Sequence, residues 1–275
     1  MLNYNPHEVL PTSEELPCSD DTPVDNELQN LIPNLLLALL ALIWQDRWDW
    51  FFGVDMGIYD RTRQILRTPI VPDGFLSLGV VRRKSNRGRL SYVLAEENNV
   101  APILVLEMVS QKYGGEYDQK ISDYASLRVL YYVIYNPDYW QRDKHDPFEV
   151  YRLENWNYVR QLGEPVWMPE FGLGIGRERG IHEGWQREWL YWYDSEGNRF
   201  STAEEMTDQE RLRADTERLR AQQAQFQLEQ ERQRAQQARR QAIARLLSMG
   251  LSVEQVAEAL GLSVEEVRQA IPKEF

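Results

Sequence analysis

The segment from Pro102 to Val109 restricts the fold of this chain more than any other. It is apolar throughout except for Glu107. An unbroken apolar run is typical of a strand covered on both faces, whereas a strand with one face in water alternates apolar and polar residues. Such a strand needs other elements packed on both sides of its sheet. The segment therefore predicts a layered α/β domain.

The neighbouring segments predict the order of elements around this strand. A helix is expected from Thr22, its N-cap, through Pro23 at the first helical position to about Gln45. A second helix is expected over residues 116–128, after a Gly-Gly break. The remaining patterns predict strands at Trp48–Val54, Ile70–Leu78 and Leu130–Tyr135, and Met56–Tyr59 either continues the first of these or starts another strand. Asp73 stands where the chain enters the strand Ile70–Leu78. Short aromatic strands over residues 147–193 are expected to extend this sheet or to cover it.

The C-terminal part has a different composition. Residues 203–247 lack Gly and Pro and are rich in Glu, Gln, Arg and Ala, which predicts one long helix. Leu212, Leu219 and Phe226 recur at intervals of seven, but the alternate core positions are polar: Thr216, Gln223 and Gln230. Because a coiled coil needs apolar residues at both positions, we expect a weak coil, through which a homodimer or a complex with a helical partner would form.

A near-repeat follows this helix. Met249–Val256 is echoed by Leu260–Val267, and in each copy a Gly ends one helix and a Ser starts the next. The pattern predicts short helices joined by tight turns, as in a helix-turn-helix motif. Glutamates outnumber the basic residues of this tail, and a phosphate backbone would be repelled. We therefore favour an oligomerisation or docking module over a DNA reader.

The composition limits the class of protein. The 275 residues are 43% hydrophobic and carry a net charge of −12, which predicts a real core and argues against general coating of nucleic acid. Cys18 is the only cysteine, which excludes an internal disulfide and fits a reducing cytoplasm. The most apolar stretch, Leu31–Trp44, is too short for a membrane span and contains Pro33. The N-terminus has no signal-peptide pattern. We expect a cytoplasmic protein without membrane association.

The negative charge is unevenly distributed. Residues 1–46 contain no Lys or Arg, whereas residues 61–89 are basic and contain Asp73 as their one acid. A basic surface beside Asp73 could meet phosphates. The candidate nucleic-acid contacts in this stretch are Arg82, Arg83, Lys84 and Arg87.

Three polar residues stand out against the apolar strands. Glu107 in a buried strand is costly unless it is paired or binds a metal. Taken alone, a salt bridge is the simpler explanation of Glu107, and a turn is the simpler explanation of Asp73 after Pro72. Their combination with Lys120 on the following helix favours a metal site beside a phosphate.

These residues carry a resemblance to a known family. Pro72-Asp73, Leu106 to Ser110, Asp118-Gln119-Lys120 with Tyr124, and Tyr131 to Ile134 resemble the Uma2 family, part of the PD-(D/E)XK superfamily of restriction-endonuclease-like proteins. The resemblance covers roughly residues 20–175. It implies a mixed central sheet flanked by helices. In the usual superfamily pattern a lysine stands two residues after the glutamate. That position is Val109 here, and Lys120 on the next helix matches the lysine of Uma2-like members.

The resemblance implies metal-assisted hydrolysis of a phosphodiester. Asp73, Glu107 and the backbone carbonyl of Met108 would hold Mg²⁺, or Mn²⁺ in its place. Lys120 would orient the attacking water or stabilise the charge of the transition state. Glu27 on the first helix and Tyr124 are accessory candidates. Glu27 is explained equally well as a solvated acid on the helix surface. Tyr124 is better explained by packing beside the site than by a part in the reaction.

Two functions follow as alternatives. The first is a Mg²⁺-dependent endonuclease acting on DNA, favoured by the three polar groups and the basic stretch. The second is a catalytically weak or inactive nuclease-fold protein that serves as an interaction and assembly module, favoured by Val109 and the acidic surface. The predicted organisation is an extended arm over residues 1–22, a nuclease-like domain over 23–200, a long charged helix over 201–247 and a helical tail over 248–275.

Overall fold

The computed structural model describes residues 12–13, 16, 26–60, 69–84, 86–112 and 114–270. The chain forms two compact units, Met1–Ala203 and Glu204–Phe275. Of the predicted N-terminal arm only Thr12, Ser13 and Leu16 are described, and the rest of that prediction lies outside the described residues. No helix in the described part of the chain combines the length and the apolar character needed to cross a membrane.

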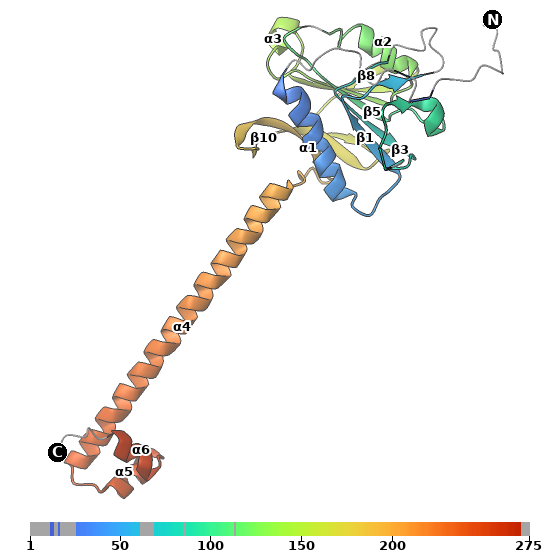
Figure 1. Ribbon diagram of the computed structural model, residues 1–275. Coiled ribbons are helices and arrows are strands. Elements are labelled where there is room, and N and C mark those ends of the chain that lie inside the picture. Colours follow the sequence, from blue (N-terminus) through green and yellow to red (C-terminus); the bar gives the residue numbers. More distant parts are fainter. Residues whose placement is uncertain are drawn as a thin grey trace, which may run out of the picture. The chain divides into compact units, whose positions relative to one another are not determined.

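The first unit is built on a mixed central sheet, as the sequence predicts. Its strand order is β1-β3-β5-β6-β7-β8, in which β5 and β6 are parallel and the other neighbours antiparallel. The bounds of these strands are β1 Trp50–Val54, β3 Gly74–Leu78, β5 Leu104–Met108, β6 Tyr131–Tyr135, β7 Phe148–Glu154 and β8 Asn157–Gln161. Figure 1 labels β1, β3, β5 and β8 of this sheet together with the helices of the chain.

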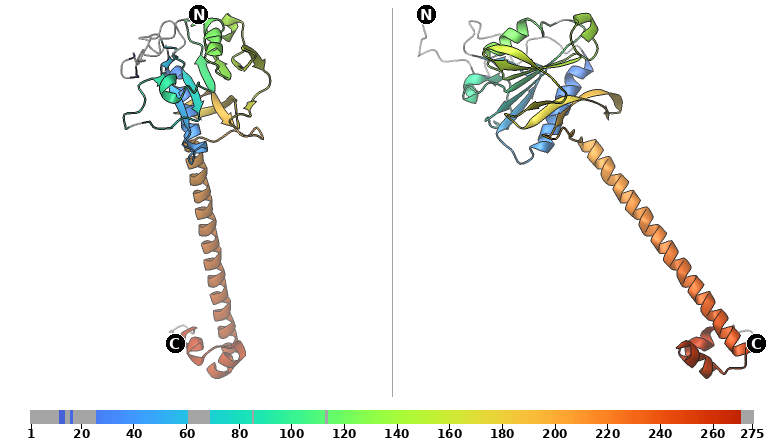
Figure 2. Two further views of the ribbon diagram at one scale, coloured as in Figure 1. Left: turned by 90° about the vertical axis from the view of Figure 1, so that its right-hand side faces the viewer. Right: turned by 180° about the vertical axis from the view of Figure 1, so that it is seen from behind.

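The predicted buried strand, β5, is covered on both faces. Leu104, Leu106 and Met108 point into a core shared with α1 (Glu27–Ile43). Val105 points into a second core, which includes Tyr124 of α2 (Gln119–Ser126). Figures 1 and 2 show α1 and α2 on opposite sides of the sheet. The alternation of a strand therefore assigns Glu107 to the side of α2.

Helix α1 starts later than its predicted N-cap. Asn26 is the N-cap, with extended backbone, and its side chain accepts hydrogen bonds from Leu28 and Gln29 N–H. The prediction of a start at Thr22 and Pro23 is thus wrong; both residues lie outside the described part of the chain. The helix is anchored at its middle, where the buried Trp192 indole N–H donates to the Leu36 carbonyl at 3.0 Å.

The aromatic strands after β6 divide between two sheets. Strands β7 and β8 extend the central sheet, whereas β9 (Val166–Met168), β10 (Leu173–His182) and β11 (Trp185–Tyr193) form a separate antiparallel sheet. The smaller elements of this unit are β2 (Ile58–Tyr59), which pairs with β4 (Tyr92–Val93), the 3₁₀ turn η1 (Leu94–Glu97) and α3 (Trp140–Asp143).

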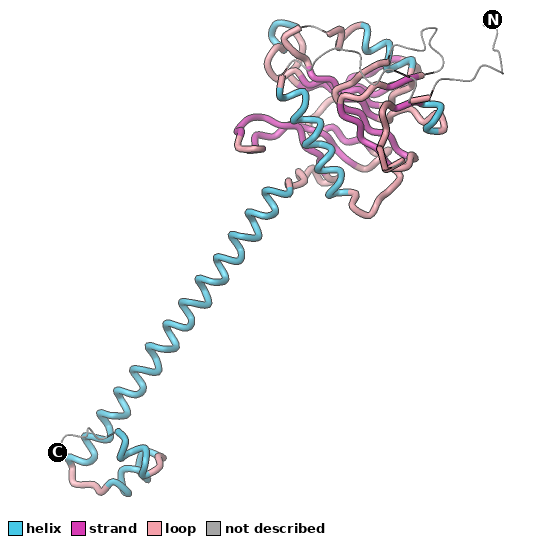
Figure 3. Tube along the Cα trace, in the orientation of Figure 1, coloured by secondary structure: helices cyan, strands magenta, loops and turns pink. Residues whose placement is uncertain are grey.

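The second unit consists of helices. Helix α4 (Ala203–Ser248) is continuous over 46 residues, as predicted, and is followed by α5 (Val253–Leu260) and α6 (Val264–Ala270) (Figure 3). The end of α4 packs on the two short helices through Ile243, Val256 and Val267. A capping box starts each short helix: the hydroxyl oxygens of Ser252 and Ser263 accept from the backbone N–H of Gln255 and Glu266, and the side chains of Gln255 and Glu266 accept from the backbone N–H of the two serines.

Gly53 on β1 lets the Phe75 ring of β3 pack directly against the β1 backbone, which a residue with a side chain would prevent. A Cβ at this position would lie 2.3 Å from a ring carbon of the fully buried Phe75 on β3. We expect Gly53→Ala to lower the free energy of unfolding by about 1–3 kcal/mol, the usual cost of overpacking a core. Urea unfolding would measure it. Gly174→Ala, with its nearest contact at 3.3 Å, is the milder control; equal effects of the two variants would contradict the prediction.

Candidate active site

The register of the central sheet brings Asp73 and Glu107 together. Gly74 of β3 pairs with Leu106 of β5, so Asp73, one residue earlier, lies beside Glu107, one residue later. The Asp73 carboxylate is half-buried and its Oδ2 accepts the Met108 N–H at 2.6 Å. The pair that the sequence predicts is thus assembled at one end of two adjacent strands.

Helix α2 contributes the other two groups. The Lys120 ammonium donates to Glu107 Oε2 at 2.8 Å, and the Tyr124 hydroxyl donates to Glu107 Oε1. Lys120 and Tyr124 are four residues apart, so they lie on the same face of the helix, one turn above the other. Glu107 is 1% exposed and receives both donors in the core between the sheet and α2.

A tight turn determines where α2 begins. The Gly115 carbonyl accepts from the backbone N–H groups of Asp118 and Lys120, both at 3.1 Å. Gly115 has a φ of 81°, which a residue with a side chain rarely adopts. The helix therefore begins at Gln119, somewhat later than predicted, and Lys120 stands in its first turn facing the sheet.

The electrostatics of the pair follow from burial. Burial raises the pKa of Asp73 well above its ordinary value, and the charge of Glu107 raises it further. Burial also raises the pKa of Glu107, against the lowering effect of Lys120. For Lys120, burial lowers the pKa, but the carboxylates of Glu107, Glu116 and Asp73 outweigh it and the net pKa is raised. The carboxyl groups of Asp73 and Glu107 therefore share one nearby positive charge, the Lys120 ammonium.

Glu116 belongs to this neighbourhood and was missed by the sequence analysis. It is 3% exposed, and its carboxylate accepts the Gly114 N–H at 3.0 Å. Its charge raises the pKa of both Glu107 and Lys120. The one signal in the sequence was an acid four residues before Lys120, which by itself is typical of a solvated helix start.

Other predicted residues lie elsewhere. Glu27 is the first residue of α1, on the opposite face of the sheet, where it lines a hollow with His182 and Trp185. The loop that carries Arg82, Arg83, Lys84 and Arg87, here called the basic loop, follows β3 after Leu78, the end of the strand remote from Asp73. Neither Glu27 nor this loop is brought into the cluster around Glu107.

Within the basic loop the charges have local roles. The Arg82 guanidinium lies 3.4 Å from the centroid of the Trp50 ring. Lys84 forms ion pairs with Glu96 at 3.0 Å and Glu97 at 3.1 Å. Arg83 and Arg87 are exposed.

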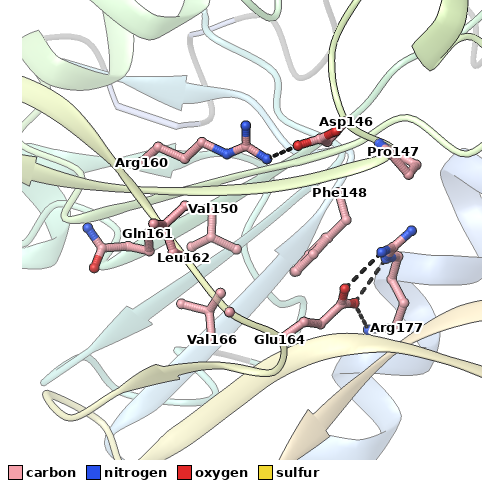
Figure 4. A pocket seen from close by; sticks show the side chains of 11 residues that line it. Asp146, Pro147, Phe148, Val150, Arg160, Gln161, Leu162, Glu164, Val166 and Arg177 are labelled. Atoms are coloured by element: carbon pink, nitrogen blue, oxygen red, sulfur yellow. Dashed lines mark hydrogen bonds and ion pairs between the residues drawn. The ribbon is translucent and has the colours of Figure 1, made fainter.

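A cavity of about 350 Å³ lies between the edge of the central sheet and the second sheet (Figure 4). Its floor is apolar, with Phe148, Val150 and Val166, all members of the core on the α1 side. Its two arginines are already neutralised by ion pairs, Arg160–Asp146 and Arg177–Glu164. None of the predicted site residues lines this cavity, so it is not the site of Asp73 and Glu107.

The comparisons with known proteins decide the family. Residues 4–185 match the model of Uma2, whose description is "Putative restriction endonuclease". The chain belongs to the Uma2 family. No curated protein and no solved structure matches it.

The Uma2 match confirms the resemblance seen in the sequence and assigns the chain to a family of restriction-endonuclease-like proteins. It contains the whole cluster of Asp73, Glu107 and Lys120 but ends before α4. Val109, at the usual superfamily position of the lysine, is 3% exposed and packs in the core with Tyr124. The ammonium that contacts the glutamate comes from α2 instead.

The donor set fits a divalent cation that takes oxygen ligands. Asp73 Oδ1 and Glu107 Oε2 are carboxylate oxygens on neighbouring strands, and the Lys120 ammonium already stands as a cation against one of them. Among the described residues no group of three His, Cys, Asp or Glu side chains could hold a metal ion. A cation here would therefore complete its shell with backbone oxygen and water, as Mg²⁺ commonly does.

Proposed function

We propose that this Uma2 protein is a Mg²⁺-dependent endonuclease that hydrolyses DNA phosphodiester bonds, with Asp73, Glu107 and Lys120 as its centre. The observation that carries the proposal is the 2.8 Å contact of Lys120 with Glu107, beside a second carboxylate from the adjacent strand. This contact brings a lysine from α2 to the two acids of the superfamily pattern, which lie on neighbouring strands. Mn²⁺ is an acceptable substitute, and a reducing cytoplasm is the expected compartment.

The cation would be held by Asp73, Glu107 and the carbonyl of Met108. Met108 N–H points to Asp73, whereas Val109 N–H points to Tyr135 on β6. Because the N–H and C=O of one strand residue point to the same neighbour, the Met108 carbonyl is directed to the side of Asp73. When bound, a divalent cation neutralises phosphate charge and makes water a better nucleophile.

The chain's own residues orient the reaction. Lys120 is 25% exposed and sits in the first turn of α2, so its ammonium can reach a phosphate oxygen or the attacking water at the edge of the site. Tyr124 is fully buried and is confined to holding Glu107. Glu27, on the other face of the sheet, has no part in this proposal.

DNA would approach as a polyanion, so exposed cations outside the cluster matter for binding. Arg83 is exposed and is the member of the basic loop best suited to phosphate contact; Arg87 is exposed too, but it already has an interaction within the chain. Arg82 and Lys84 contribute less, because one stacks on Trp50 and the other is paired with Glu96 and Glu97.

The second candidate function is assembly through α4, with the nuclease fold catalytically weak or inactive. Leu212, Leu219 and Phe226 are 69%, 60% and 66% exposed on this helix. Large apolar side chains at intervals of seven favour a second helix, from another copy or another protein, as their cover. The domain organisation predicted from the sequence, with the helix and tail after a nuclease-like domain, suits either function.

A cleavage assay tests the first candidate. We expect the purified chain to cut plasmid or oligonucleotide DNA with Mg²⁺ or Mn²⁺ and to stop when EDTA removes the cation. Glu107→Gln should lower the rate by more than about a hundredfold, since even residues that only support a metal ligand cost 10–100-fold. Glu149→Gln, another buried carboxylate of the same sheet, is the matched control. Absence of cleavage, or equal cleavage by Glu107→Gln and the wild type, would favour the assembly function.

A further inference from the structure

The two donors to Glu107 differ in their freedom to move. Tyr124 is 0% exposed, and its ring packs 5.1 Å from that of Tyr132. The Lys120 side chain is 25% exposed and ends a flexible stem of four carbons. Tyr124 cannot leave Glu107 Oε1 without opening the core, whereas Lys120 can leave Oε2 toward solvent.

We propose that the Lys120 ammonium occupies the place of the divalent cation on Glu107 Oε2, so that lysine and cation compete for this oxygen while Tyr124 holds Oε1. The inference rests on the proposed function in so far as a divalent cation binds Asp73 and Glu107. It goes further by making Lys120 an antagonist of cation binding as well as a catalytic group. Tyr124 becomes a positioning residue that keeps the Glu107 carboxylate in one orientation during the exchange.

The displaced ammonium has a second carboxylate to interact with. Glu116 is buried and, after Glu107, is the next group whose charge acts on Lys120. The turn at Gly115 ties the backbone N–H of Lys120 to the segment that carries Glu116. Lys120 can therefore leave Glu107 while its backbone position in α2 is kept.

Competition and a supporting role predict opposite effects of removing Lys120 on the affinity for the cation. If Lys120 only kept Glu107 in shape, its removal would weaken cation binding. If Lys120 competes, its removal frees Oε2 and abolishes the repulsion between two cations, so binding becomes tighter while cleavage is lost. Affinity for the cation and activity then change in opposite directions.

Mn²⁺ binding to the full chain without DNA tests this, with free Mn²⁺ measured by electron paramagnetic resonance. We expect Lys120→Met to lower the Mn²⁺ dissociation constant about tenfold, the size of one charge-assisted hydrogen bond released from competition. Lys112→Met removes an equal charge from an exposed residue of the preceding loop and should change it less than about twofold. Tyr124→Phe should weaken Mn²⁺ binding.

The outcomes separate this inference from the proposed function. Unchanged or weaker Mn²⁺ binding in Lys120→Met and in Lys120→Gln, with native circular dichroism, overturns it; so does absence of binding in wild type and both variants. Tighter binding in both variants supports it even if the wild type cuts no DNA, a result that would refute only the nuclease proposal.

Discussion

Asp73→Asn is expected to make the first unit more stable at neutral pH. In the folded protein burial and the charge of Glu107 raise the pKa of Asp73 well above its ordinary value of 3.8, so the charged form is disfavoured by folding. Asparagine removes the charge, and its carbonyl oxygen can still accept the 2.6 Å hydrogen bond from Met108 N–H. We expect a gain of at least about 1 kcal/mol, or roughly 2–4 °C in Tm for a unit of this size.

The pH dependence of this gain has a definite sign. The folded protein binds a proton at Asp73 more tightly than the unfolded chain does, so this residue makes stability fall as pH rises from the ordinary value through the raised pKa. The advantage of Asp73→Asn should be complete above the raised pKa and should shrink as pH falls toward 3.8. Thermal unfolding of both proteins at pH 5, 6, 7 and 8 would measure it.

Added cation should reverse the order of the two proteins. A ligand that binds only the folded state stabilises it by about 2.7 kcal/mol at a hundred times its dissociation constant. Mg²⁺ should therefore raise the Tm of the wild type and leave that of Asp73→Asn nearly unchanged. Asp55→Asn, which removes a weaker contribution to the pKa of Asp73, is the control and should behave like the wild type. A stabilising effect of Mg²⁺ on Asp73→Asn equal to that on the wild type would contradict the assignment.

The central sheet and the acid pair could be predicted because they depend on local patterns. The apolar run around Glu107 marks a strand that is covered on both faces, and β5 is buried throughout. Asp73 is at the start of the strand next to it, so pairing of those strands is enough to join the two acids. The spacing of Lys120 and Tyr124 on a helix then gives the face that turns to the sheet.

Glu116 and the basic loop could not be predicted, because their environment depends on contacts distant in sequence. The Tyr132 hydroxyl on β6 donates to the Glu116 carbonyl at 2.8 Å, which holds that turn against the sheet. Arg82 stacks on Trp50, a residue of another strand. A basic run is compatible with phosphate contact in any sequence, and only the fold reveals that part of this one packs internally.

The start of α1 was predicted wrongly for a different reason. Two N-cap residues precede the helix, Thr22 and Asn26; Asn is the better cap, but the Pro that follows Thr22 suits a first helical position. Packing decides between them, because Leu28 is the first α1 residue in the core. The division of the later strands into two sheets is likewise set by packing, since alternation alone does not say which sheet a strand joins.

Glu107→Leu is expected to have the largest effect on stability of any change at the site. It leaves the Tyr124 hydroxyl buried without its acceptor and the Lys120 ammonium without its counter-charge. Removing one partner of a buried pair costs about 3–5 kcal/mol, and the remaining exposure of Lys120 favours the lower end of this range. Urea unfolding of wild type and variant, at constant m-value, would measure the loss.

Compensating variants separate the cost of unpaired groups from the loss of the glutamate itself. In Glu107→Leu/Lys120→Met the unpaired charge is gone, and adding Tyr124→Phe also removes the unpaired hydroxyl. Because apolar replacement of a buried ion pair is often neutral or stabilising, the triple variant should recover most of the lost stability and none of the Mn²⁺ binding. A triple variant as unstable as Glu107→Leu alone would mean that Glu107 supports the fold through contacts other than Lys120 and Tyr124. Recovery would instead mean that the chain keeps this buried charge at the expense of stability, as expected of a carboxylate retained for its chemistry.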